Sequence, residues 1–261
     1  MGKWYPATAV VTGASSGIGA AFAAALAARG CDLILVARRE SRLLDLAKEL
    51  ESAHGVAVRV LAADLSEPAD LRRVTAVFED PANPVDIVIN NAGFATHGAL
   101  ADHTAAKVRE EIAVNVAALA ELTHAALPPM VTRDRGVIVN IASTAAFQPI
   151  PFMAVYGATK AFVLSFTEAL WGELEDSGVT ALAVCPGATD TEFFDVAGEA
   201  ASVGSRQTPQ QVVATAVRVL DRRNPPPSVV SGAANALSSG LPRILPRRTT
   251  IRVTRRLVAA K

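Results

Sequence analysis

The chain has little cysteine, few aromatic residues, no excess of charge and no apolar run of membrane length. Its two cysteines, Cys31 and Cys185, cannot form the disulfide framework of a small secreted domain, so we expect buried thiols in a reducing compartment. Aromatic residues make up 5% of the chain and the formal net charge is +0, which argues against a nucleic-acid binder. The longest apolar run, residues 20–28, is about half of a membrane span.

The sequence also lacks a metal-site pattern and a secretion signal. No cysteine and histidine residues have the spacing of a metal site, so no metal is expected. The four histidines are therefore interpreted as non-ligands: His54, His97, His103 and His124. Lys3 is followed by Trp4, Tyr5 and Pro6 instead of the apolar core of a signal peptide, which indicates a cytoplasmic protein.

Short apolar runs alternate with helical patterns along the 261 residues, of which 51% are hydrophobic. The runs are continuous, which is typical of strands covered on both faces. They occupy residues 7–11, 33–37, 57–61, 85–89, 137–141 and 180–184. Helical periodicity covers residues 18–29, 42–52, 106–126 and 162–175. This alternation predicts an α/β fold with a doubly wound, Rossmann-like parallel sheet in a single domain.

Charge divides the chain near Asn224. Residues 1–223 hold 18 basic and 25 acidic side chains, and residues 224–261 hold 7 basic and none acidic, together the 25 of each sign in the whole chain. Three prolines precede a predicted last strand at 228–230, so we expect a body at 1–223 and a basic helical extension after it. The extension could pack on the acidic body of its own or a neighbouring subunit, or contact anionic lipid. Nucleic acid is least favoured, because no aromatic residue lies among the arginines.

The first predicted strand ends in a glycine-rich turn that leads into a helix. The turn reads Thr12-Gly13-Ala14-Ser15-Ser16-Gly17-Ile18-Gly19. Unpaired N–H groups and the helix dipole favour an anion at a helix N-terminus, and glycine lets a pyrophosphate approach the backbone. The glycine spacing differs from the strict G-x-G-x-x-G fingerprint, so a tight structural turn is the alternative. Its place between strand and helix favours a dinucleotide cradle.

Further motifs follow in a fixed order along the chain. They are Asn90-Asn91-Ala92-Gly93, Asn115, Ser143, Tyr156 with Lys160, and Pro186-Gly187 with Thr191. Together with Thr12–Gly19 they resemble the short-chain dehydrogenase/reductase superfamily over about residues 7 to 195. The resemblance implies an NAD(P)-dependent oxidoreductase acting on CH–OH groups. It also implies a homodimer or homotetramer assembled through the helices that hold Asn115 and Tyr156.

Tyr156 and Lys160 are four residues apart, so a helix places both on one face. A free phenol has a pKa of about 10, and a nearby ammonium lowers it by about one to three units. This pairing predicts a tyrosine that serves as general acid or base near neutrality. The alternative is a half-buried tyrosine beside a solvated lysine.

The resemblance assigns a role to each motif. Tyr156 exchanges a proton with the substrate oxygen, and Ser143 holds that oxygen near the phenol, unless Ser143 only caps a loop. Lys160 tunes Tyr156 and binds the nicotinamide ribose. Asn115 holds a water that links Lys160 to solvent, with a surface asparagine as the alternative. Further cofactor contacts are expected at Gly13, Ser15, Ser16, Gly17, Ile18, Gly19, Leu65, Asn91, Ala92, Gly93, Pro186, Gly187, Thr189 and Thr191.

The second strand ends in Arg38-Arg39-Glu40 and lacks the acidic residue that binds the ribose 2′-OH of NAD. Guanidinium groups suit a 2′-phosphate, so we predict NADP(H), with Arg38 as the first contact and Arg39 as the second. NAD(H) is less favoured, and a solvated arginine pair is the alternative. Asp64, after the third strand, is expected to bind the adenine amino group or to cap a helix.

Apolar residues cluster in two segments that should lie over the carboxyl edge of the sheet. They are Phe193, Phe194, Val196 and Val203 in a substrate loop at about 191–208, and Phe147, Ile150, Phe152 and Met153 after Ser143. These residues predict a hydrophobic ketone, aldehyde or secondary alcohol that is acyl, sterol-like or polyketide-like. The main hypothesis is an oxidoreductase transferring hydride between NADP(H) and such a substrate. The alternative is a catalytically vestigial dinucleotide-binding sensor or scaffold, held at a membrane by its basic tail.

Overall fold

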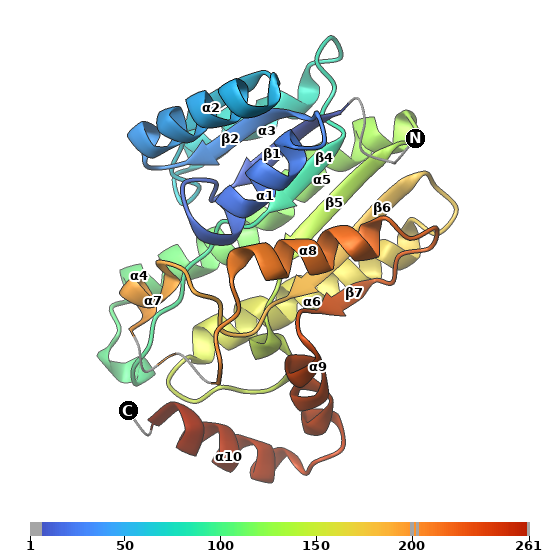
Figure 1. Ribbon diagram of the computed structural model, residues 1–261. Coiled ribbons are helices and arrows are strands. Elements are labelled where there is room, and N and C mark those ends of the chain that lie inside the picture. The colour runs from blue at the N-terminus through green and yellow to red at the C-terminus, as the bar shows by residue number, and fades with distance from the viewer. Residues whose placement is uncertain (1–6, 199–200, 202–203, 260–261) are drawn as a thin grey trace.

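The computed structural model describes residues 7–198, 201 and 204–259, so the predictions on residues 3–6 and on Val203 lie outside the described residues (Figure 1). Its centre is a parallel sheet of seven strands in the order β3-β2-β1-β4-β5-β6-β7. The strands are β1 (Thr8–Thr12), β2 (Asp32–Ala37), β3 (Val58–Ala62), β4 (Ile87–Asn90), β5 (Gly136–Ile141), β6 (Val179–Cys185) and β7 (Ser228–Val230). The predicted doubly wound fold is confirmed, and each strand lies within two residues of its predicted range.

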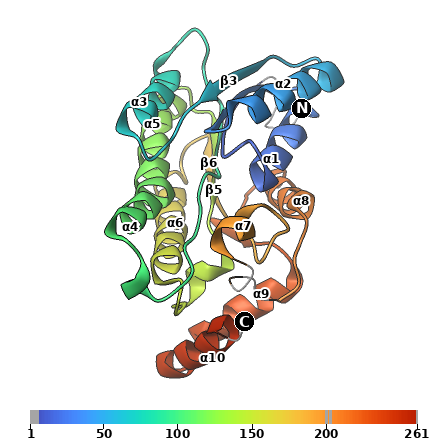
Figure 2. The same ribbon diagram turned by 90° about the vertical axis from the view of Figure 1, so that its left-hand side faces the viewer.

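Helices cover both faces of the sheet (Figure 2). One layer holds α1 (Gly17–Ala27), α2 (Glu40–His54) and α8 (Pro209–Leu220), and the other holds α3 (Pro68–Thr75), α4 (Ala105–Ile112), α5 (Leu119–Thr132) and α6 (Ala154–Glu173). Phe22, Leu43 and Val212 belong to the core on the first face. Leu122 and Leu170 belong to the core on the second face. The continuous apolar runs of the strands supply the sheet side of both cores, which is why these runs do not alternate.

Two helices differ from their predicted ranges by more than two residues. The predicted helix at 106–126 is divided into α4, a π-helical segment η3 (Ala113–Ala118) and α5, and Asn115 lies in the π-helical segment. The wider π turn turns the Asn115 side chain inward, and such turns are frequent at functional sites. The predicted helix at 162–175 begins eight residues earlier as α6, at Ala154, and therefore includes Tyr156 and Lys160.

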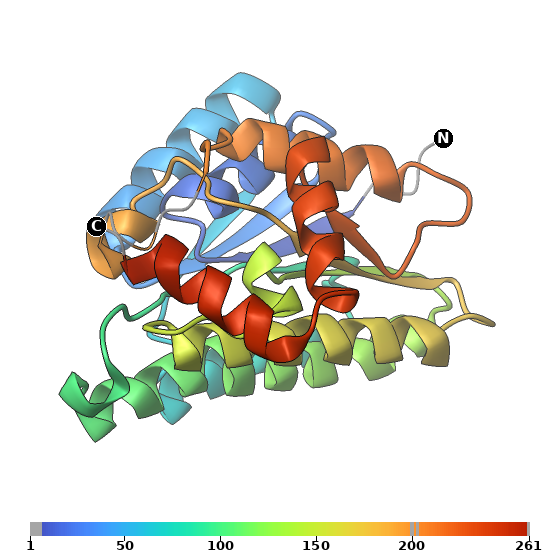
Figure 3. The ribbon, with the colours of Figure 1, turned by 90° about the horizontal axis from the view of Figure 1, so that it is seen from below.

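The end of the chain lies at the carboxyl edge of the sheet. After β7 come α9 (Ala233–Gly240), the short turn η6 (Leu241–Arg243) and α10 (Arg247–Ala259), which we call the C-terminal arm. Seen from below, α10 passes across this edge, and α7 (Phe193–Ala197) lies at the same end of the molecule (Figure 3). Short 3-10 turns complete the described chain: η1 (Ala76–Glu79), η2 (Leu100–Asp102) and η4 (Thr144–Phe147). Within the described residues, no helix has the length and apolarity to cross a membrane.

Candidate active site

A cavity of about 830 Å³ opens at the carboxyl edge of the sheet, where the strand order reverses between β1 and β4. This is the place where open α/β sheets bind their ligands. Every predicted site residue lines the cavity except Gly19, which packs inside the glycine turn, and Asn115, which lies behind the wall. The lining therefore includes Ser143, Ile18, Leu65, Ala92, Gly93, Pro186, Gly187 and Thr189.

The glycine turn is packed too tightly for other residues. Gly13 and Gly17 have φ angles of 65° and 56°, in the left-handed region that favours glycine. A Cβ on Gly13 would lie 2.7 Å from Nδ2 of Asn91, and a Cβ on Gly17 would lie 2.8 Å from Cγ2 of Thr191. The alternative of a tight structural turn thus describes part of its role.

The same turn leaves the start of α1 available to an anion. Ser16 precedes α1 without making a side-chain cap, and the first turn of α1 carries no acidic residue. Orphan N–H groups and the helix dipole therefore face the lined cavity, and no acidic residue of the first turn of α1 offsets them. The end of β1 is fixed from β4, because Thr12 Oγ1 accepts hydrogen bonds from the N–H groups of Asn91 and Ala92 at 2.9 and 3.0 Å. Nδ2 of Asn91 also donates to the Thr12 carbonyl at 2.9 Å. These features fit a pyrophosphate.

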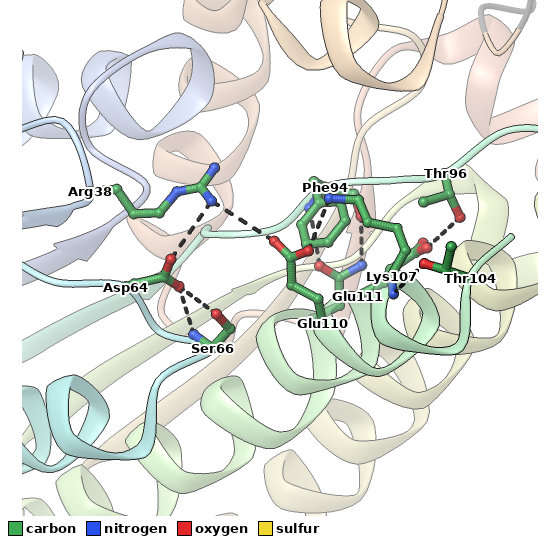
Figure 4. A network of polar contacts seen from close by, with 10 residues as sticks. Arg38, Asp64, Ser66, Phe94, Thr96, Thr104, Lys107, Glu110 and Glu111 are labelled. Carbon is green, nitrogen blue, oxygen red and sulfur yellow. Dashed lines mark hydrogen bonds and ion pairs between the residues drawn. The ribbon is translucent and has the colours of Figure 1, made fainter.

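Arg38 lies in a network of charges at one end of the cavity (Figure 4). Its Nη1 atom is 3.7 Å from Oδ2 of Asp64 and 3.9 Å from Oε1 of Glu110 on α4. Asp64 accepts hydrogen bonds from the N–H and hydroxyl of Ser66 at 2.9 and 2.7 Å. Asp64 therefore closes a local turn, and the alternative that it caps a helix is wrong, because Glu67 occupies the N-cap of α3.

Arg39 points across the glycine turn. Its guanidinium donates to Oγ of Ser15 and Ser16 at 3.0 Å each, and to Oε2 of Glu192 at 2.6 Å. The other oxygen of Glu192 accepts from Arg42 of α2. These hydrogen bonds hold the pKa of Glu192 at about 2, below its usual range. No motif in the sequence marks Glu110, Arg42 or Glu192, so these three residues were not predicted.

Tyr156, Ser143 and Lys160 meet on the cavity wall. Ser143, beyond the end of β5, lies beside the Tyr156 hydroxyl and lowers its pKa, and the Oγ of Ser143 accepts from the N–H of Ala145 at 3.1 Å. The same Ser143 hydroxyl also caps the η4 turn. Nζ of Lys160 donates to the Ile141 carbonyl at 2.8 Å and lies 5.8 Å from the Tyr156 ring centroid. The alternative of a solvated lysine is wrong, because Lys160 is only 5% exposed.

The prediction that Lys160 lowers the pKa of Tyr156 is wrong. Burial raises the pKa of Tyr156 to about 12, although the hydrogen bond with Ser143 opposes the rise, and the charge of Glu111 adds to it. Burial lowers the pKa of Lys160 to about 8. Desolvation disfavours both the phenolate form of Tyr156 and the ammonium form of Lys160. Nζ of Lys160 donates its hydrogen bond to the Ile141 carbonyl. Tyr156 is consequently a neutral phenol, the form that donates a proton.

Asn115 braces the loop after β4. Its Oδ1 accepts from the Phe94 N–H at 3.1 Å, and its Nδ2 donates to the Phe94 carbonyl at 2.8 Å and to Thr159 Oγ1 at 3.2 Å. The side chain is fully buried, so the alternative of a surface asparagine is wrong. A Cβ on Gly93 would lie 2.9 Å from Oδ1 of Asn115 and 3.5 Å from Nζ of Lys160, so Gly93 separates the two side chains.

Part of the predicted apolar wall is present. Phe193, Phe194, Ile150 and Met153 line the cavity, and the Phe193 ring centroid is 5.4 Å from that of Tyr156. Two of the predicted residues lie elsewhere: Phe147 packs in the separate cluster of Leu119 and Val163, and Phe152 packs beside His97. The side chain of Val196 lies outside the described part of the structure.

The C-terminal arm supplies the rest of the wall, which the sequence analysis did not predict. The lining includes Leu241, Leu245, Val253, Thr254, Leu257 and Val258. Val258 is 3% exposed and packs in the same cluster as Tyr156 and Met153. The arm thus covers the body of its own subunit, as one alternative expected. The contact is largely apolar, because within the described chain no arginine of α10 forms an ion pair.

Comparison with known proteins agrees with this geometry. Residues 7–201 match the family model described as short chain dehydrogenase, and the chain belongs to this family. The protein is accordingly an oxidoreductase of carbonyl and CH–OH groups.

Individual relatives extend the likeness over most of the chain. A short chain dehydrogenase of Pseudocercospora fijiensis is 39% identical over 198 residues, which are 74% of this chain and 63% of that protein. A short-chain dehydrogenase from Sphingobium yanoikuyae, solved in complex with NADPH, shares 39% identity with a TM-score of 0.81, covering 92% of this chain and 96% of that chain. A 7beta-hydroxysteroid dehydrogenase shares 27% identity with a TM-score of 0.87, covering 97% and 99%.

Proposed function

We propose that this protein reduces hydrophobic ketones or aldehydes with NADPH and that Tyr156 is the proton donor. The observation that carries this proposal is a neutral phenol, with Ser143 beside it, on the wall of the cavity that also holds the glycine turn. A general acid must hold its proton at the working pH, and a pKa of about 12 meets this requirement.

The residues of the cavity fit NADP(H). The uncapped start of α1 would hold the pyrophosphate, and Lys160 would hold the nicotinamide ribose. Arg38 and Arg39 would hold the 2′-phosphate, in keeping with the NADPH complex of the Sphingobium relative. When bound, this cofactor supplies the hydride that reduces the carbonyl carbon.

The chain's own residues supply orientation and the proton. Ser143 and Tyr156 would both bind the carbonyl oxygen, and Tyr156 would transfer its hydroxyl proton to that oxygen. The charged form of Lys160, at pH values below about 8, stabilises negative charge that develops near Tyr156. Apolar side chains of Phe193 and the C-terminal arm line the cavity beside Tyr156, and an apolar surrounding strengthens these electrostatic contacts.

The substrate class follows from the walls. Apolar side chains surround the phenol, so we expect an acyl-chain, sterol-like or polyketide-like carbonyl compound, and the 7beta-hydroxysteroid dehydrogenase relative supports the sterol-like option. We further propose a cytoplasmic location, in keeping with two buried cysteines that form no disulfide, and a homo-oligomeric state, which the family resemblance implies. Contact of the arm with anionic lipid stays a prediction, which flotation of vesicles with and without residues 241–261 tests.

A carbonyl panel tests the proposed activity. Loss of NADPH absorbance is measured with small, acyl-chain and steroidal ketones, and turnover of the hydrophobic members is expected. The wild type should prefer NADPH over NADH in kcat/KM, and Arg38→Ala should reduce that preference because it removes a phosphate contact. Equal selectivity before and after the substitution would remove Arg38 from the phosphate site. Cofactor binding without turnover across the panel would favour the sensor or scaffold.

A further inference from the structure

We infer that Glu192 is a specificity-determining residue whose carboxylate competes with the 2′-phosphate of NADP(H) for Arg39 and Arg42. Its release on cofactor binding would also loosen the substrate wall that begins at the next residue. The inference rests on the proposed use of NADP(H) and adds to it a residue of the segment after β6.

Glu192 occupies the position of an anion at the edge of the glycine turn. One of its oxygens is 2.6 Å from Nη1 of Arg39, and the other contacts Nη1 of Arg42. Arg39 is held toward the turn by Ser15 and Ser16, whose hydroxyls accept from its guanidinium at 3.0 Å each. Two guanidinium groups and two hydroxyls therefore converge beside the predicted 2′-phosphate site, and a carboxylate already neutralises them.

A phosphate is the stronger ligand for this group. The Glu192 carboxylate carries one charge, whereas a phosphate monoester carries about 1.5 to 2 negative charges and three acceptor oxygens. The Glu192 pairs are also accessible to water, because its side chain is 40% exposed and those of Arg39 and Arg42 are 43% and 48% exposed. Exposed ion pairs are weak, so a 2′-phosphate can displace the carboxylate. NAD(H) lacks the 2′-phosphate and therefore has no group that replaces the Glu192 carboxylate at these arginines.

The competition reaches the substrate through the neighbouring residue. Phe193 follows Glu192, begins α7, and has its ring centroid 5.4 Å from that of Tyr156. Phe194 is buried and lies under the guanidinium of Arg206, 4.2 Å from its ring centroid. Because Glu192 links the start of α7 to Arg39 and Arg42, its displacement removes two ion pairs from the segment that carries Phe193.

The test uses binding of a cofactor fragment and needs no turnover. Adenosine 2′,5′-bisphosphate and 5′-AMP are titrated calorimetrically into the wild type, Glu192→Gln and Asp190→Asn. Asp190 is the matched control, because its exposed carboxylate lies in the same segment, 3.9 Å from Arg206, and contacts neither Arg39 nor Arg42. Glu192→Gln should bind the bisphosphate about three- to tenfold more tightly, as expected for loss of exposed competing pairs, and 5′-AMP equally. Asp190→Asn should change either affinity less than twofold.

Hydrogen exchange of the amides of residues 193–197 reports the coupling. In the wild type the bisphosphate should raise their exchange rates and 5′-AMP should not. In Glu192→Gln these rates should already be high without ligand. Rates that respond to neither ligand in the wild type would overturn the coupling.

The outcomes separate this inference from the proposed cofactor. If the wild type prefers the bisphosphate and Glu192→Gln binds it no more tightly than Asp190→Asn does, the inference fails and the NADP(H) proposal stands. If only Glu192→Gln prefers the bisphosphate, the inference stands and the wild-type preference fails. If neither protein prefers it, both are overturned.

Discussion

Tyr156 and Lys160 are 9% and 5% exposed, and burial disfavours the charged form of each. The tyrosine therefore keeps its proton at every physiological pH, and the lysine loses its charge near pH 8. Tyr156 can therefore donate a proton to a carbonyl oxygen, and this favours the reduction direction. Oxidation of an alcohol would need the phenolate, the form that burial penalises.

The pair predicts the pH dependence of reduction. Because the pKa of Lys160 is about 8 and lies below its usual value, its positive charge is present at low pH and is lost as pH rises through 8. We expect kcat/KM for carbonyl reduction to be constant below this value and to fall about tenfold per pH unit above it. Titration of Tyr156 should cause no further change of kcat/KM in this range, because its pKa is about 12. The measurement is kcat/KM from about pH 6 to pH 10.

Lys160→Arg is the control for this profile, because a guanidinium stays charged throughout the range. The fall above pH 8 should vanish in the variant, whatever its absolute rate. A fall that persists at the same pH would show that another group titrates. Direct titration of the Lys160 amine by NMR in the wild type provides an independent value.

At the scale of the element, the π-helical segment η3 matters because it turns Asn115 toward the loop after β4. Asn115 pairs with both the N–H and the carbonyl of Phe94, so Asn115→Ala would leave two backbone groups without their partner. We expect a loss of about 2–4 kcal/mol in the free energy of unfolding, measured by urea denaturation. Asn83→Ala is the control, since Asn83 is exposed and its Nδ2 donates to a neighbouring surface carboxylate, Oδ2 of Asp80, at 2.9 Å. Equal losses in the two variants would contradict the bracing role.

The sequence predicted those elements whose structure follows from a local pattern of residues. Continuous apolar runs located the strands, because burial on both faces demands such runs. Strand order then brought the glycine turn, Asn91, Ser143 and Tyr156 to one edge. The start of α6 was missed because residues 154–161 have no helical apolar stripe: Tyr156 and Lys160 face the cavity. The raised pKa of Tyr156 depends on its burial in the folded chain, which the periodicity of the sequence does not predict.

At the scale of the whole molecule, the C-terminal arm completes the cavity. The amphipathic pattern of the arm was visible in the sequence, but its partner was not. Thr250, Val253 and Val258 of α10 face the cavity, while Arg252 and Arg256 are exposed to solvent. The arm therefore turns part of its apolar stripe toward the substrate wall, where Val258 is buried, and presents its positive charge outward, while Ile251, Val253 and Leu257 stay 38% to 53% exposed.

Removal of residues 241–261 should act on the substrate more than on the cofactor. The deletion removes apolar wall residues, so the KM of a steroidal or long acyl ketone should rise more than about tenfold, because a lost contact of about 1.4 kcal/mol corresponds to tenfold. The KM of a small ketone and the affinity for adenosine 2′,5′-bisphosphate should change less than about threefold. Ile251→Ala replaces an exposed residue of the same helix, and it should alter neither the KM of the ketones nor the affinity for the bisphosphate. Equal effects on small and large ketones would contradict a wall function.

The most direct test of the proposed chemistry is a comparison of Tyr156→Phe with the wild type, measuring NADPH affinity by fluorescence and single-turnover NADPH oxidation with a hydrophobic ketone. The variant loses one oxygen and keeps the ring that packs with Phe193. We expect unchanged affinity within about twofold and a rate lowered by about 10² to 10⁴, the usual contribution of a general acid. A variant that oxidises NADPH at the wild-type rate would show that Tyr156 does not donate the proton.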